Sequence, residues 1–155
     1  MPPILYRLAR PFFARLWVVL RGLTMGVRGV VIDGEGRILL IRHGYTPGWT
    51  FPGGGVEINE TAFEALRREL REEANVEITG PATLLGVFHQ PQFSRRDHVL
   101  VYVIRSFTWN GAHKPNREIA ECAFFSRDNL PEDMSRGARR RLGEIFEGMP
   151  VSEVW

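Results

Sequence analysis

Apolar residues recur along the chain with characteristic spacings that predict where strands and helices lie. Short runs rich in Val, Ile and Leu predict strands at about 26–32, 37–42, 82–90, 98–108 and 119–125. The first two runs flank Asp33-Gly34-Glu35-Gly36, which is a strong turn signal, so we expect them to form a β-hairpin. Residues 44–48 read as a loop and Trp49-Thr50-Phe51 as a short extended piece. A glycine-rich turn, 52–55, comes next.

Capping signals in the sequence indicate where the central helix begins and ends. Thr61 and Glu64 are three residues apart, as in a capping box, so the helix should begin near Thr61. It should end near Asn75, because asparagine tolerates the left-handed cap conformation. Further helices are expected at 135–147 and at 3–23, the latter broken at Pro11. Strands mixed with two or three helices predict an α/β sandwich with a mixed sheet.

Composition limits the class of protein. A chain of 155 residues suits one domain with a single core. Its single cysteine, Cys122, excludes an internal disulfide and a zinc site built from cysteines, which fits a reducing, cytoplasmic setting. No apolar run reaches the roughly 18–20 residues that a membrane-spanning helix needs. The first apolar stretch is also a poor match to a signal peptide.

Charge divides the chain into two parts. Five of the 20 basic residues precede Asp33, the first acidic residue, so the basic pI reflects the N-terminal region and does not by itself imply nucleic-acid binding. We therefore treat 1–23 as a basic and apolar helical segment and 24–155 as the main domain. The segment could pack on the domain, form a homodimer interface or lie on an anionic membrane. Packing or dimerisation is favoured, because Arg15 lies off the polar face formed by Arg7, Arg10 and Arg21.

The central helix gathers carboxylates on an unusual face. On a helical projection Glu69, Glu72 and Glu73 fall within an arc of about 100° that borders the apolar stripe instead of lying opposite it. Like charges three and four residues apart repel, which Arg68 would relieve in part by reaching Glu64 and Glu72. A bound Mg²⁺ or Mn²⁺ would convert the remaining repulsion into coordination. A salt-bridged surface helix is the competing interpretation.

The loop before the helix favours the metal interpretation. Gly53, Gly54 and Gly55 allow backbone groups to approach a ligand closely. Glu60 adds a further carboxylate just before the helix begins. Glycines and acids at fixed distances in one short stretch are a more specific signal than either feature alone.

This stretch resembles the Nudix box, G-x5-E-x7-R-E-U-x-E-E-x-G-U, in which U is a bulky aliphatic residue. Matching positions in this chain are Gly54, Glu60, Arg68-Glu69-Leu70, Glu72-Glu73 and Val76. Asn75 stands in place of the last glycine, a change that a left-handed helix cap tolerates. The box covers 54–76, and the surrounding pattern extends the resemblance over roughly 25–131.

The resemblance implies a Nudix-type α/β/α sandwich and a MutT-like hydrolase that splits a phosphoanhydride bond in a nucleoside diphosphate linked to another moiety. It also implies roles. Glu69, Glu72 and Glu73 would bind Mg²⁺ or Mn²⁺, with the Gly53 carbonyl as a further ligand. Glu69 would act as general base, Glu60 would hydrogen-bond or reach the metal through water, and Arg68 would orient a box glutamate.

Other polar and aromatic residues are weaker candidates for substrate binding. Six of them lie at strand ends and loops: Arg42, His43, His89, Arg95, Glu118 and Glu121. Ordinary solvent-facing roles explain most of these about as well. The resemblance also implies a further catalytic or metal-binding acid near the strand predicted at about 119–125, and the sequence does not decide between Glu118 and Glu121. Tyr45, Phe88, Phe93 and Trp109 could stack on a base or fill the core.

Two further hypotheses compete with a metal-dependent pyrophosphohydrolase. One is a non-catalytic nucleotide-binding regulatory module on the same fold, which a degenerate box would favour, although the acidic positions are all filled here. The other is a membrane-associated adaptor, which depends on the first 22 residues alone. No DNA-reading helix-turn-helix pattern is present, so we expect no DNA partner. The family resemblance implies a nucleotide-type small molecule as the substrate.

Overall fold

A computed structural model describes residues 21–155 of the chain. The predicted helix at 3–23, and with it the hypotheses about packing, dimerisation or membrane contact, lies almost wholly outside the described residues. Within the described part, no helix is long and apolar enough to cross a membrane.

The described residues form eight strands, two α-helices and one short 3₁₀-helix. In chain order they are β1 (Thr24–Val31), β2 (Ile38–His43), β3 (Trp49–Thr50), α2 (Ala62–Ala74), β4 (Val76–Ile78), β5 (Ala82–His89), β6 (Asp97–Ile104), β7 (Phe107–Trp109), β8 (Ile119–Phe125), the 3₁₀-helix η1 (Arg127–Asn129) and α3 (Arg136–Phe146). Both α-helices begin and end within a residue of the predicted positions. The strand predicted over 98–108 is instead two strands, β6 and β7, which belong to different sheets.

The strands pair in three small sheets, ordered β1-β6-β5, β3-β2-β8 and β4-β7. In the first sheet β1 runs parallel to β6, with Thr24 opposite Asp97 and Val31 opposite Ile104, whereas β5 runs antiparallel to β6. The predicted mixed sheet is therefore confirmed.

The predicted hairpin between 26–32 and 37–42 is wrong. The turn forms, since the amide of Asp33 donates to the Arg37 carbonyl and a single bridge joins Ile32 to Ile38. Beyond that bridge the two strands separate, because β1 pairs with β6 while β2 pairs with β3 and β8. The turn residues specify the reversal of the chain but carry no information about which strand each arm will pair with.

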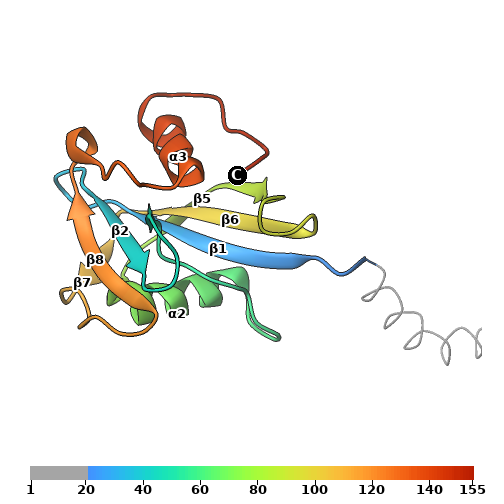
Figure 1. Cartoon of the computed structure of the whole chain (residues 1–155), viewed down its shortest axis with the longest axis horizontal. Coiled ribbons are helices and arrows are strands. Elements are labelled where there is room, and N and C mark those ends of the chain that lie inside the picture. Colours follow the sequence, from blue (N-terminus) through green and yellow to red (C-terminus); the bar gives the residue numbers. More distant parts are fainter. Residues whose placement is uncertain (1–20) are drawn as a thin grey trace, which may run out of the picture.

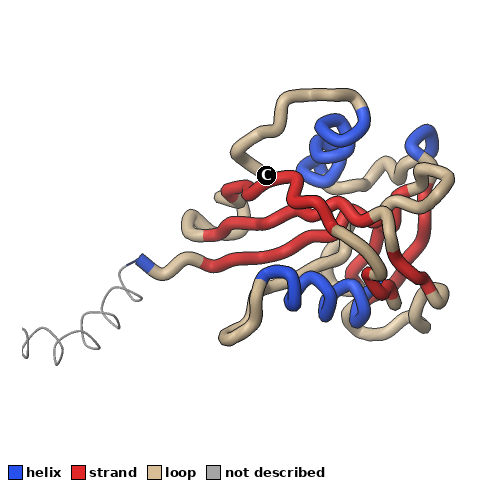
Figure 2. The backbone as a smooth tube through the Cα atoms, turned by 180° about the vertical axis from the view of Figure 1, so that it is seen from behind, coloured by secondary structure: helices blue, strands red, loops and turns tan. Residues whose placement is uncertain are grey.

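The strands lie between two helices, with α2 on one face and α3 on the other (Figures 1 and 2). Alternate residues of β1 point to opposite faces, as expected for a strand. Val27 and Val31 pack with Leu66 and Leu70 of α2, whereas Val30 belongs to a second core cluster beneath α3. These two cores are the physical basis of the predicted α/β/α sandwich, which the structure confirms.

The chain after α3 is fastened to the domain by a buried ion pair. Arg141 and Glu144, one turn apart on α3, are almost fully buried and lie 2.7 Å apart (Nε to Oε2). Glu144 also accepts from the amide of Ser152, while Arg141 donates to the Val154 carbonyl. The tail then runs beside β5, where the amide of Trp155 donates to the His89 carbonyl.

Candidate functional site

Backbone pairing fixes the glycine-rich loop against β1. The amide of Val27 donates to the Gly54 carbonyl, and the amide of Val56 donates to the Met25 carbonyl. Gly53 has a φ of +144°, and a Cβ there would lie 2.1 Å from the Val27 carbonyl oxygen. Only glycine fits that position, so the loop can lie close beside the strand.

The helix that follows is anchored at both ends by the predicted caps. Thr61 accepts from the amide of Glu64, and the Glu64 carboxylate accepts from the amide of Thr61, which completes the capping box. Asn75 adopts the left-handed conformation, with φ 55° and ψ 38°. The substitution of asparagine for the family's glycine therefore preserves the cap geometry.

Glu73 joins the helix to the glycine loop. Its Oε2 accepts a 2.6 Å hydrogen bond from the Gly53 amide, and its Oε1 faces Nε2 of His43 at 3.8 Å. The residue is only 4% exposed. Burial raises the pKa of Glu73 to about 7, an effect that the hydrogen bond from Gly53 and the charge of Arg28 only partly offset.

Glu69, one turn earlier, lies beside Gly54. A Cβ on Gly54 would come within 2.4 Å of Glu69 Oε1, so the missing side chain leaves room for this carboxylate. Arg68 donates to the same oxygen at 2.6 Å and also to Glu60 at 2.7 Å. Burial raises the pKa of Glu69, although Arg68 opposes that shift. Arg68 thus hydrogen-bonds two box glutamates and lies 3.6 Å from a third, its predicted partner Glu72. The other predicted partner, Glu64, instead bonds Thr61.

Arg28 is a site residue that the sequence analysis did not select. It projects from β1 and donates to the carbonyl oxygens of Phe51 and Gly53, at 3.1 and 2.8 Å. Burial lowers the pKa of Arg28, while the nearby charges of Glu73 and Glu69 raise it. The available signal was a single charged residue inside an otherwise apolar strand, which is unusual unless a partner is near.

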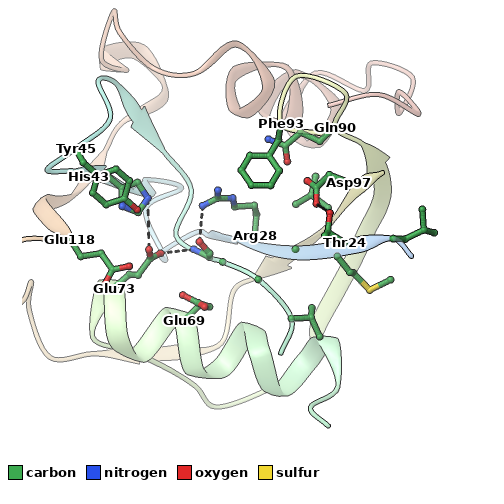
Figure 3. A pocket seen from close by; sticks show the side chains of 18 residues that line it. Thr24, Arg28, His43, Tyr45, Glu69, Glu73, Gln90, Phe93, Asp97 and Glu118 are labelled. Carbon is green, nitrogen blue, oxygen red and sulfur yellow. Dashed lines mark hydrogen bonds and ion pairs between the residues drawn. The ribbon is translucent and has the colours of Figure 1, made fainter. Parts of the chain in front are cut away.

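These groups line one cavity of about 650 Å³. Figure 3 shows Glu69 and Glu73 along one side, with Arg28 between them and a second group made of Thr24, Gln90, Phe93 and Asp97. Of the weaker candidates, His43 and Glu118 line the cavity, as do Tyr45 and Phe93. A smaller adjoining cavity of about 350 Å³ shares Arg28, His43, Tyr45, Gln90 and Phe93 with it and reaches Trp155.

Other predicted site residues are not among those that line the main cavity. Arg42 and Glu121 form an ion pair with each other across β2 and β8. The His89 ring lies 3.2 Å from the Arg95 carbonyl oxygen and against His98. Glu72 has a side chain that is 61% exposed and lies 3.6 Å from Arg68. Phe88 is fully buried, and the Trp109 indole donates to the Ala74 carbonyl, so both of these aromatic residues are structural.

The donor set suits a hard divalent cation that keeps part of its water shell. No group of three or more His, Cys, Asp or Glu side chains in residues 21–155 is arranged to hold a metal ion by itself. However, Glu69 and Glu73 each use one carboxylate oxygen in a hydrogen bond to the protein and retain the other. Mg²⁺ is typically bound by one or two carboxylates, with water and substrate phosphate completing its octahedron. The residues present therefore fit such an ion.

Comparisons with known proteins identify relatives of this chain. The chain is 35% identical over 105 residues to the ADP-ribose pyrophosphatase of Methanocaldococcus jannaschii, a match that covers 66% of this chain and 62% of that protein. It is 48% identical over 61 residues to the RNA pyrophosphohydrolase of Halorhodospira halophila, covering 39% of this chain and 32% of the relative. The chain thus spans less than two thirds of either relative.

Solved structures and a family model extend the match to the whole fold. The MutT NUDIX hydrolase from Burkholderia pseudomallei superposes with a TM-score of 0.69 at 26% identity, covering 79% of this chain and 97% of that one. The NUDIX domain model matches residues 22–144, which include the sheets, α2 and most of α3. The chain belongs to the NUDIX domain family.

Proposed function

We propose that this protein is a Mg²⁺-dependent hydrolase that cleaves the phosphoanhydride bond of a nucleoside diphosphate linked to another moiety. The observation that carries the proposal is the pair of inward carboxylates, Glu69 and Glu73, beside the glycine loop in one cavity. The relatives support it, since their names describe an ADP-ribose pyrophosphatase and an RNA pyrophosphohydrolase.

The proposed roles follow from the contacts. Glu69 and Glu73 would hold the ion through the carboxylate oxygens that their hydrogen bonds leave available, and Glu72, whose side chain is 61% exposed, would supply the third carboxylate. The Gly53 carbonyl is a further candidate ligand, although it also accepts from Arg28. When bound, Mg²⁺ neutralises diphosphate oxygens and makes coordinated water more acidic. Glu69 takes the proton of the attacking water, while Glu60 and Arg68 keep its carboxylate in place.

The charges that line the cavity support these proposed roles. A diphosphate would meet repulsion from the two glutamates alone, so it requires the cation between them. The Arg28 guanidinium lies between the acidic end and the far end of the cavity, where it can offset phosphate charge. Hydrolysis then adds water across one P–O–P bridge and releases two phosphate-bearing products.

A substrate panel tests the proposal. ADP-ribose, a nucleotide sugar, a dinucleoside polyphosphate, nucleoside triphosphates and 5′-triphosphate RNA should be incubated with Mg²⁺ and with Mn²⁺, and both products identified. Hydrolysis in ¹⁸O-water then reveals which phosphorus is attacked. Tight nucleotide binding without turnover of any member would overturn the proposal in favour of the regulatory module.

A further inference from the structure

We propose that the far end of the main cavity binds an amino-bearing nucleobase, which stacks on Phe93 and donates a hydrogen bond to Asp97. This inference rests on the proposed function, because it assigns the other end of the same site. It adds a recognition role for residues of β6 and of the loop 90–97.

Phe93 presents an aromatic face with no protein side chain stacked on it in the described ring contacts. Its side chain lines both cavities and is 76% exposed. The loop that carries it is nevertheless closed by backbone hydrogen bonds, since the amide of Phe93 donates to the Gln90 carbonyl and the amide of Gln90 donates to the Asp97 carbonyl. An exposed ring on a closed loop beside a cavity suits stacking of a planar base.

Asp97 supplies the polar half of the subsite. It lines the cavity although it is only 6% exposed. One carboxylate oxygen, Oδ1, accepts from the Thr24 hydroxyl at 2.6 Å, which fixes the group at the start of β6. A carboxylate has about four lone-pair positions, so acceptor capacity remains for a ligand. The side-chain amide of Gln90 lies on the same side of the cavity (Figure 3).

Charge assigns the orientation of the substrate. A carboxylate at the far end repels phosphate, and the other acidic residues that line the cavity, Glu69, Glu73 and Glu118, lie at its opposite end (Figure 3). The phosphates therefore belong with Glu69, Glu73 and Arg28, and the group beside Asp97 should be neutral and rich in N–H donors. An exocyclic amino group on a stacked purine satisfies both conditions, because it is planar, uncharged and donates in the plane of the ring.

The test measures affinity in the presence of Mg²⁺ by titration calorimetry, without requiring turnover. Three ligands separate the contributions: AMP, purine riboside 5′-monophosphate, which lacks only the 6-amino group, and ribose 5-phosphate, which lacks the base. Comparing GMP with IMP, which lacks the 2-amino group, tests an amino group at position 2 of the purine in the same way. We expect AMP to bind at least about tenfold more tightly than ribose 5-phosphate, given the strength of base–aromatic stacking. At least one amino-bearing base should bind about tenfold more tightly than its partner that lacks the amino group.

Variants of the protein test which residues cause these differences in affinity. In Phe93→Ala, the affinity for AMP should fall to within about threefold of the affinity for ribose 5-phosphate. Asp97→Asn should reduce the amino discrimination at least about threefold, because a charge-assisted hydrogen bond becomes a neutral one. Asp128→Asn, an equal charge change on the exposed η1 segment outside both cavities, should leave every affinity ratio unchanged.

Several results would overturn the inference. One is equal binding of AMP and ribose 5-phosphate, and another is loss of base dependence in Tyr45→Ala but not in Phe93→Ala. If Asp97→Asn weakens the binding of AMP and of ribose 5-phosphate equally, the residue contacts the ribose and not the base. Hydrolysis accompanied by any of these results refutes the subsite alone, whereas the expected affinities without hydrolysis refute only the proposed reaction.

Discussion

The amide of Gly53 donates to the carboxylate of Glu73, which joins the glycine loop to the helix twenty residues later in the chain. This bond fixes one oxygen of Glu73 and leaves the other facing the cavity and His43. Burial also places the pKa of Glu73 near neutrality, so the same contact links the geometry of the site to its charge.

Replacing Glu73 with glutamine should abolish most turnover while the fold persists. The side-chain oxygen of the introduced glutamine can still accept from the Gly53 amide, but the negative charge offered to the metal is lost. We expect kcat/KM to fall at least about 100-fold, the scale typical of a removed catalytic group. Glu72→Gln should have a smaller effect, because its side chain is 61% exposed and its contact with Arg68 is long, at 3.6 Å. Chelation with EDTA should stop the wild-type reaction, and unchanged rates in both variants would refute the metal assignment.

The stability of the metal-free protein should fall as pH rises between about 4.5 and 7. Glu73 has a folded-state pKa of about 7 against 4.5 in the unfolded chain, so the folded state binds this proton more tightly. The contribution is fully present below pH 4.5 and disappears as pH rises through 7, at up to about 3 kcal/mol. Denaturant unfolding in EDTA at pH 5 and pH 8 measures it. Glu73→Gln should flatten this part of the profile, and added Mg²⁺ should restore stability at pH 8.

Gly54→Ala and Gly55→Ala form a matched pair. A Cβ on Gly54 would lie within 2.4 Å of Glu69 Oε1, whereas one on Gly55 would meet no atom within 4 Å. Gly54→Ala should therefore displace the Glu69 carboxylate and lower kcat about 10- to 100-fold, since a shift of about 1 Å can have that effect. Thermal unfolding should change little, because a flexible side chain absorbs the collision. Equal kinetics for the two variants would contradict the role of Gly54.

Arg141→Met should destabilise the protein by about 3–5 kcal/mol, because it leaves the buried Glu144 without its partner. The double variant with Glu144→Leu should recover part of the loss, since two apolar side chains can replace a buried ion pair. Arg140→Ala, on the exposed face of the same helix, should stay within about 0.5 kcal/mol of wild type. Urea unfolding of the four proteins provides the measurement. A double variant less stable than Arg141→Met would contradict the explanation.

Local signals in the sequence predicted local structure well. The capping box of Thr61 and Glu64 and the left-handed Asn75 defined α2 almost to the residue, because caps depend on atoms within one turn. The inward direction of Glu69 and Glu73 also followed from helical periodicity, since both border the stripe that packs on the core. Glu72 falls in the same arc, yet its side chain is 61% exposed and its carboxylate lies 3.6 Å from Arg68.

Long-range pairing was beyond these signals. Arg42 was a substrate candidate, but Glu121 is its direct partner across two strands whose pairing the sequence did not predict. Asp97 was not selected, although the β1–β6 register places it opposite Thr24 and at the cavity. Arg28 became a site residue only once β1 was seen to lie beside the glycine loop. Each of these depends on which strands are neighbours, and turn residues do not encode that.

The parallel pairing of β1 with β6 has a consequence for biosynthesis. Thr24 and Asp97 are 73 residues apart, so a ribosome must deliver most of the domain before β1 meets its ladder partner. Until then the edge of β1 that β6 later covers stays open, a condition under which nascent polypeptides associate wrongly or recruit chaperones. Contacts between such distant residues are expected to make folding slow. The yield of folded protein in a recombinant host would then depend strongly on growth temperature.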